Sequence, residues 1–88
     1  MKQEKVESLK HLKEILSDGQ GRDFFIQLNY GQRSSKFISW DGGNTFYVLN
    51  YIDDTEQELT ETQLMDDGYT NIGVAIKRGA LFLESTEN

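Results

Sequence analysis

Residues 36–52 read KFISWDGGNTFYVLNYI, and this stretch predicts a β-hairpin that decides the fold. Two segments rich in aromatic and β-branched residues, Lys36–Trp40 and Thr45–Ile52, flank the sequence DGGN at positions 41–44. Glycine readily adopts the positive φ angles of a tight hairpin turn, and Asp and Asn suit the neighbouring positions. We therefore expect the two glycines to be the central residues of a two-residue turn.

That turn sets a register in which Trp40 lies beside Thr45. Phe37, Phe46, Val48 and Ile52 then share one face, and Ile38, Trp40, Tyr47, Leu49 and Tyr51 share the other. A small antiparallel sheet with one solvated side alternates between apolar and polar residues, and this hairpin does not. Another element, a second copy of the chain or a partner should therefore cover the second face. Its candidate interaction residues are Trp40, Tyr47 and Tyr51.

The patterns before the hairpin predict one helix and one strand. Apolar residues at three- and four-residue steps indicate an amphipathic helix over Lys2–Ser17, ended by Asp18-Gly19. Alternation over Asp23–Tyr30 indicates a strand that joins the hairpin in a three-stranded antiparallel meander.

The patterns after the hairpin predict one or two short helices and a short C-terminal strand. Thr60 and Gln63 have the spacing of a capping box, so a helix should begin there. A second helix should end before Gly79, where glycine suits a left-handed conformation. Residues 80–83 are apolar and should form a strand at a sheet edge. The expected fold class is therefore α+β.

Length and composition limit the functions that we consider. The 88 residues should form one small domain, 1–88, with residues 1–3 and 85–88 frayed. The chain has no cysteine, which excludes disulfides and thiolate metal sites. Its 15 acidic and 9 basic residues give a formal charge of −6, which disfavours nucleic acid as a partner. The first sixteen residues resemble neither a signal peptide nor a membrane span, so we expect a cytoplasmic protein without membrane contact.

No residue pattern predicts a catalytic site, a metal site or a cofactor. His11 is the one histidine, and its neighbours on the expected helix suit a boundary position better than catalysis. The acidic run at 53–58 lacks the spacing of an EF-hand, so we interpret it as a solvated loop.

The segment Arg33-Ser34-Ser35-Lys36 is the best local candidate for an anion site. Two cations, two hydroxyls and free loop N–H groups in four residues could hold a phosphate or a carboxylate. The alternative is a polar turn in which Ser34 and Ser35 bond to their own backbone.

These observations favour a non-enzymatic accessory or regulatory module that acts by protein interaction, with a partner protein or by self-association. The small size, the missing catalytic groups and the second apolar face support this prediction. The alternative is an anion- or nucleic-acid-binding domain that uses the Arg33–Lys36 loop and the aromatic sheet face.

Overall fold

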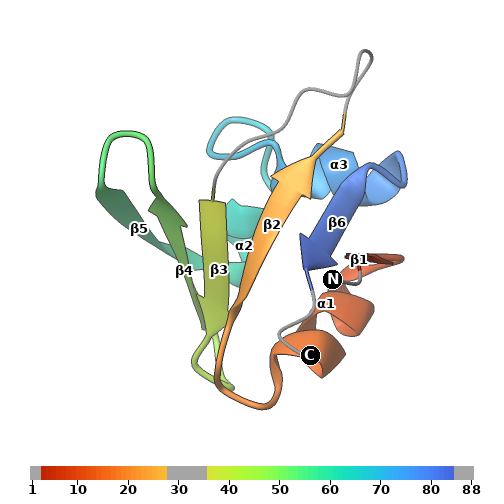
Figure 1. The fold of residues 1–88 in the computed structure, drawn as a ribbon, viewed down its shortest axis with the longest axis horizontal. Coiled ribbons are helices and arrows are strands. Elements are labelled where there is room, and N and C mark those ends of the chain that lie inside the picture. The colour runs from red at the N-terminus through yellow and green to blue at the C-terminus, as the bar shows by residue number, and fades with distance from the viewer. Residues whose placement is uncertain (1–2, 28–35, 85–88) are drawn as a thin grey trace.

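The computed structural model describes residues 3–27 and 36–84, and these form one antiparallel sheet with three short helices (Figure 1). The strand order in the sheet is β1-β6-β2-β3-β4-β5. The strands are β1 (Gln3–Lys5), β2 (Arg22–Ile26), β3 (Lys36–Trp40), β4 (Thr45–Asn50), β5 (Thr55–Thr60) and β6 (Leu81–Glu84). The helices are α1 (Leu9–Leu16), α2 (Glu61–Leu64) and α3 (Ile72–Lys77).

The predicted N-terminal helix and three-stranded meander are wrong, because the sheet has six strands. The first of them, β1, occupies part of the segment predicted as helix and pairs with β6. Helix α1 begins only at Leu9, since Ser8 is extended and its side chain accepts a hydrogen bond from the His11 backbone N–H. A serine in this position sets a helix start. The pairing of β1 joins distant parts of the chain, which local periodicity does not report.

The acidic run predicted as a loop is also partly a strand. Residues 51–54 form a tight turn, and β5 then pairs with the whole length of β4. Within β5, Leu59 is 4% exposed and anchors the strand to the core. The C-terminal strand does form, as β6, but it lies between β1 and β2 instead of at an edge.

The hairpin forms where it was predicted, but its register differs by one residue. Trp40 pairs with Phe46, and the backbone N–H of Asp41 donates to the Thr45 carbonyl at 3.1 Å. The Asp41 carboxylate accepts hydrogen bonds from the backbone N–H groups of Gly43, at 2.7 Å, and Thr45, at 3.2 Å. These bonds stabilise a three-residue loop. Gly42 has a positive φ of 86° and Gly43 does not, whereas a type I′ turn needs positive φ at both central positions.

Two other local predictions are confirmed. Thr60 and Gln63 form the capping box at the start of α2, with both reciprocal hydrogen bonds present. Gly79 follows the end of α3 with a φ of 68°.

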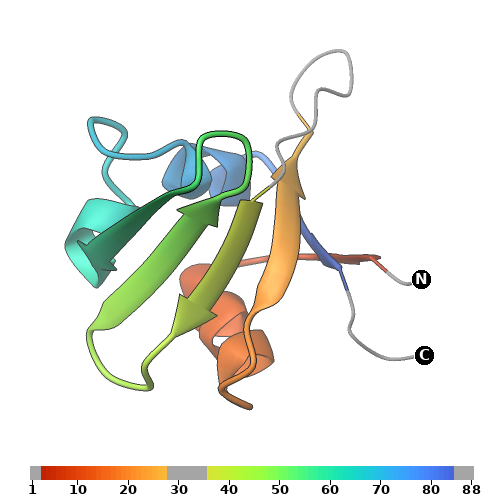
Figure 2. The same ribbon diagram turned by 60° about the vertical axis from the view of Figure 1, so that its left-hand side comes forward.

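All three helices pack against one face of the sheet, which we call the inner face (Figures 1 and 2). The sheet contributes Phe24, Ile38, Phe46, Val48, Leu59, Leu81 and Leu83 to this core. The helices contribute Leu12, Leu16, Leu64, Ile72, Ala75 and Ile76. Within the part of the chain that the structure describes, no helix is long and apolar enough to cross a membrane.

Candidate functional site

The open edge of the sheet at β5 is the first feature that can bind another molecule. The hydrogen bond from Asp41 N–H to Thr45 makes these two residues a hydrogen-bonded pair. Because the antiparallel ladder alternates, the even-numbered residues of β4 bond to β5. Their partners in β5 are Thr55, Gln57 and Leu59. Glu56 and Glu58 therefore direct their N–H and C=O groups away from the sheet.

Thr60 is the next residue of β5 that should direct its backbone groups away from the sheet. Its N–H bonds to the Gln63 side chain and not to β4, which supports this assignment. No strand in 3–27 or 36–84 pairs with the outer side of β5. The edge is straightforward to reach, since Glu56 and Glu58 are exposed. Ile52 lies in the turn that leads into β5, and 80% of its surface is exposed to solvent. β5 thus presents backbone groups that no strand in the described ranges pairs with, two carboxylates and a nearby apolar side chain.

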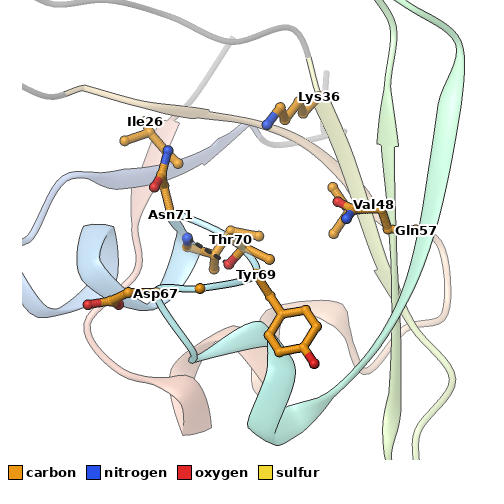
Figure 3. Close-up of a pocket in the computed structure, with 10 residues that line it drawn as sticks. Ile26, Lys36, Val48, Gln57, Asp67, Tyr69, Thr70 and Asn71 are labelled. Carbon is orange, nitrogen blue, oxygen red and sulfur yellow. Dashed lines mark hydrogen bonds between the residues drawn. The ribbon is translucent and has the colours of Figure 1, made fainter.

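The second feature is a cavity of about 190 Å³ on the inner face, between the sheet and residues 67–72 (Figure 3). Its described lining consists of Ile26, Lys36, Val48, Gln57, Asp67, Gly68, Tyr69, Thr70, Asn71 and Ile72. One wall is held in place by Thr70, whose hydroxyl donates to the Leu64 carbonyl at 2.8 Å and accepts from the Ile72 N–H at 3.0 Å. Tyr69 is 55% exposed, and in Figure 3 its ring points away from Lys36.

Lys36 extends over this cavity from the start of β3. In Figure 3 its ammonium group points from β3 toward Ile26 and Asn71, while the Asp67 carboxylate points away from it. Lys36 is half-buried and forms no salt bridge with any described residue. The other predicted members of the anion site, Arg33, Ser34 and Ser35, lie outside the described residues.

The structure separates the three predicted interaction residues. Trp40 lies on the inner face, stacked on Phe46 at a centroid distance of 6.0 Å, and its indole N–H donates to the Gly43 carbonyl at 3.0 Å. The Lys13 ammonium lies 5.7 Å from the centroid of its ring. The prediction that Trp40 shares a face with Tyr47 is therefore wrong. The change of register by one residue moves β4 to the opposite face relative to β3.

Tyr47 lies on the face opposite the helices, which we call the outer face. Phe25, Phe37, Leu49 and Phe82 share this face. Tyr47, Phe37, Leu49 and Phe82 are half-buried there. None of these five residues belongs to the core under the helices, so the described part of the sheet has apolar residues on its outer face, but not the set that was predicted.

Tyr51 lies at the end of β4 and is 49% exposed. Its hydroxyl donates to the Asp23 carboxylate at 2.7 Å, which connects the β4 end to β2. This hydrogen bond, with a smaller contribution from desolvation and from the charge of Asp23, raises the pKa of Tyr51 to about 12. The aromatic ring is accessible, but its hydroxyl is engaged.

His11 lies on α1, half-buried, with both ring nitrogens hydrogen-bonded. Its Nδ1 accepts from the Glu7 backbone N–H at 3.0 Å, so Nε2 carries the proton and donates to Glu4 at 3.1 Å. The ring thereby joins α1 to β1. No group of three or more His, Cys, Asp or Glu residues in 3–27 and 36–84 is placed to hold a metal ion.

The edge residues Glu56 and Glu58 and the cavity residues Gln57 and Tyr69 were not predicted from the sequence. A signal for β5 was present, because TEQELT alternates and places Gln57 and Leu59 on one side. The charge of the segment hid this alternation. Comparisons of the chain with protein-family models, with curated proteins and with solved structures found no match.

Proposed function

We propose that this protein is a non-enzymatic interaction module that binds an extended, basic segment of a partner protein by adding it as a strand beside β5. The observation that carries the proposal is the pair of outward-directed backbone units at Glu56 and Glu58 on an open edge. Main-chain hydrogen bonds supply affinity in this mode of recognition, and alternate side chains supply specificity.

Charge favours a basic partner. The side chains of Glu56 and Glu58 both project to the outer face, because they pair with Leu49 and Tyr47. A partner strand would place alternate residues directly beside these carboxylates, and opposite charges in such positions stabilise a sheet. The formal charge of −6 adds long-range attraction for the same partner.

A second copy of the chain is a poorer occupant of this edge. Antiparallel pairing of two β5 strands about Gln57 would place Glu56 of one copy opposite Glu58 of the other, on both sides of the symmetry axis. Like charges directly opposite each other destabilise a sheet. Acidic residues also protect an open edge from indiscriminate pairing, so the same residues that repel a copy select a basic segment.

Selection of binders from a random peptide library tests the proposal. We expect the selected peptides to carry Lys or Arg at every second position, and to shift the backbone amide NMR signals of residues 56–60 most. Glu58→Pro should abolish binding, because proline removes an outward-facing N–H and is tolerated on an edge strand. Glu58→Gln keeps that N–H and is the matched control, with weakened but detectable binding.

Comparison of Glu58→Pro with Glu58→Gln separates the loss of the backbone N–H from the loss of the charge. A third variant, Gln57→Pro, tests which N–H groups of β5 face outward. Gln57→Pro removes an N–H that faces β4 and should unfold the protein, whereas Glu58→Pro should leave it folded. Peptides that shift only the outer-face residues Phe37, Tyr47 and Leu49, or that bind Glu58→Pro as well as the native protein, would contradict strand addition.

A further inference from the structure

The open edge at β5 is short, because it is closed at both ends. At its start, Asp54 has a positive φ of 57°, so the backbone there leaves the extended conformation that a ladder requires. At its end, the Thr60 N–H donates to the Gln63 side chain at 3.0 Å, and α2 begins at the next residue. Neither Asp54 nor Thr60 therefore continues the open ladder. The outward-directed groups that remain are the N–H and C=O groups of Glu56 and Glu58.

These four backbone groups set the length and the direction of the partner. In antiparallel pairing, two residues directly opposite each other exchange both of their hydrogen bonds. A partner then satisfies Glu56 and Glu58 with a span of three residues, of which the first and the third are bonded. In parallel pairing each residue bonds to the two neighbours of its opposite residue, so the same four groups need a span of five residues. The short edge therefore favours an antiparallel segment.

The three positions of that segment alternate between the two faces of the sheet. The first and third residues project to the outer face, directly beside the carboxylates of Glu58 and Glu56. Neither carboxylate forms a salt bridge with any residue in 3–27 or 36–84, so both are available to basic side chains. The middle residue projects to the inner face beside Gln57, whose exposed side chain lines the cavity (Figure 3). A polar residue suits this position, because an apolar one would stay in contact with water.

We infer that the partner segment is a basic–polar–basic unit of three residues that pairs with β5 in the antiparallel direction. The inference rests on the proposed function, since it specifies the ligand of the same edge. One lysine or arginine lies opposite Glu58, the middle residue lies beside Gln57, and the second lysine or arginine lies opposite Glu56. The pattern fixes the number, the spacing and the order of the basic residues, which a general attraction of cations to an acidic protein does not.

NMR titration of the full chain with capped peptides tests the spacing. The matching peptide is acetyl-Ser-Lys-Thr-Lys-Ser-amide, and its isomer acetyl-Ser-Lys-Lys-Thr-Ser-amide has the same charge and composition. We expect the isomer to bind about fivefold more weakly, because only one of its lysines can lie directly opposite a glutamate. Equal binding of the two peptides, or no shift at residues 56–60 up to the solubility limit, would overturn the inference.

Two longer peptides of equal charge test the length of the unit. Acetyl-Thr-Lys-Thr-Lys-Thr-Lys-amide continues the alternation, whereas acetyl-Thr-Lys-Thr-Lys-Lys-Thr-amide carries the same three lysines without it. We expect their affinities to agree within about twofold, because the edge offers only two outward-facing residues. An advantage of about fivefold for the alternating peptide would mean that the ladder continues past Asp54 or Thr60, and the limit of three residues would be wrong.

A spin label on the peptide tests the direction. The chain has no cysteine, so a cysteine added to the C-terminal end of the matching peptide can carry the label without modification of the protein. In the antiparallel complex the label should broaden the amide signals of residues 53–55 more than those of residues 60–62. The reverse pattern would overturn the antiparallel assignment.

Substitution of the two glutamates tests which lysine each one contacts. Glu58→Gln should weaken binding of the matching peptide, and replacement of the first lysine of the peptide by norleucine should then have little further effect. In Glu56→Gln the same replacement should still weaken binding, because the first lysine lies opposite Glu58. Asp67→Asn removes one charge away from the edge and is the matched control, which should bind like the native protein. If the first lysine depends on Glu56 instead, the order is wrong.

Glu58→Pro distinguishes failure of this inference from failure of strand addition. If peptides of both spacings bind equally and Glu58→Pro abolishes binding of both, the partner pairs with β5 but the basic–polar–basic pattern is wrong. If Glu58→Pro binds the matching peptide like the native protein, the peptide is not an added strand, and both proposals are wrong.

Discussion

At the scale of single residues, Tyr51 shows how one exposed side chain can be tied to the fold. Its hydroxyl reaches from the end of β4 to Asp23 in β2, across the intervening β3. The phenol can donate this hydrogen bond only while it is protonated. Its contribution to stability therefore depends on pH, in a direction that follows from the shifted pKa.

We expect Tyr51 to ionise near pH 12, above the usual value of 10.0. Because the pKa is raised in the folded state, the stabilisation is fully present below pH 10 and is lost as pH rises from about 10 to about 12. Absorbance of the phenolate at alkaline pH measures this step, and Tyr51→Phe should remove a tyrosine transition near pH 12. Asp23→Asn should return that transition toward 10; if it does not, the hydrogen bond is not the cause.

At the scale of elements, the hairpin shows what local sequence can and cannot predict. The positions of β3 and β4 follow from aromatic and β-branched residues, and the capping box at Thr60 follows from the spacing of two side chains. The register depends on the Asp41 carboxylate, which stabilises a loop one residue longer than two glycines suggest. One residue of register was enough to assign Trp40 to the wrong face.

The strands at the two sheet edges were not predicted, because β1 is too short to show a periodic pattern and the charge of β5 hid its alternation. β1 is three exposed residues long, and its position follows from its pairing with β6 near the other end of the chain. β5 carries an acidic pattern typical of a loop, and only its register with β4 places Leu59 in the core. The candidate binding edge is β5 itself. From the predicted anion site, Lys36 alone could be placed, at a cavity formed by elements far apart in sequence.

Trp40 connects the hairpin to the helices, and its truncation tests that arrangement. Trp40→Ala should lower the free energy of unfolding by about 3 kcal/mol, because the ring packs on Phe46 against the core. Chemical denaturation measures this loss. Trp40→Phe keeps an aromatic ring on Phe46 and loses the bond to Gly43, so it should cost only about 1 kcal/mol. If Trp40→Ala has the same free energy of unfolding as the native protein, the Trp40 ring does not contribute to the core.

At the scale of the whole molecule, the two faces and the two ends of the sheet have different roles. The inner face is occupied by α1, α2 and α3, and the sheet ends in a short strand on one side and a six-residue strand on the other. The long edge is acidic, and under the proposed strand addition its charge would favour a basic partner and oppose pairing with a second copy. Reversal of that charge should therefore convert repulsion between copies into recognition.

We expect the double variant Glu56→Lys with Glu58→Lys to associate with the native protein. Antiparallel pairing of the two β5 strands then places each glutamate opposite a lysine. Both proteins keep a net negative charge, so general attraction does not explain such a complex. Sedimentation should show a larger species in the equimolar mixture than in either protein alone, and added salt should weaken it.

The matched control for this experiment makes two acid-to-lysine substitutions away from the β5 edge. Asp66→Lys with Asp67→Lys alters two exposed residues between α2 and α3, and its mixture with the native protein should sediment as the separate components do. In a second control, the Glu58→Pro variant replaces the native protein in the mixture with Glu56→Lys/Glu58→Lys. This mixture should form no complex, because Glu58→Pro lacks one outward-facing N–H. If the mixture with Glu56→Lys/Glu58→Lys behaves as two independent monomers at low salt, β5 does not accept an added strand, and the proposed mode of interaction is wrong.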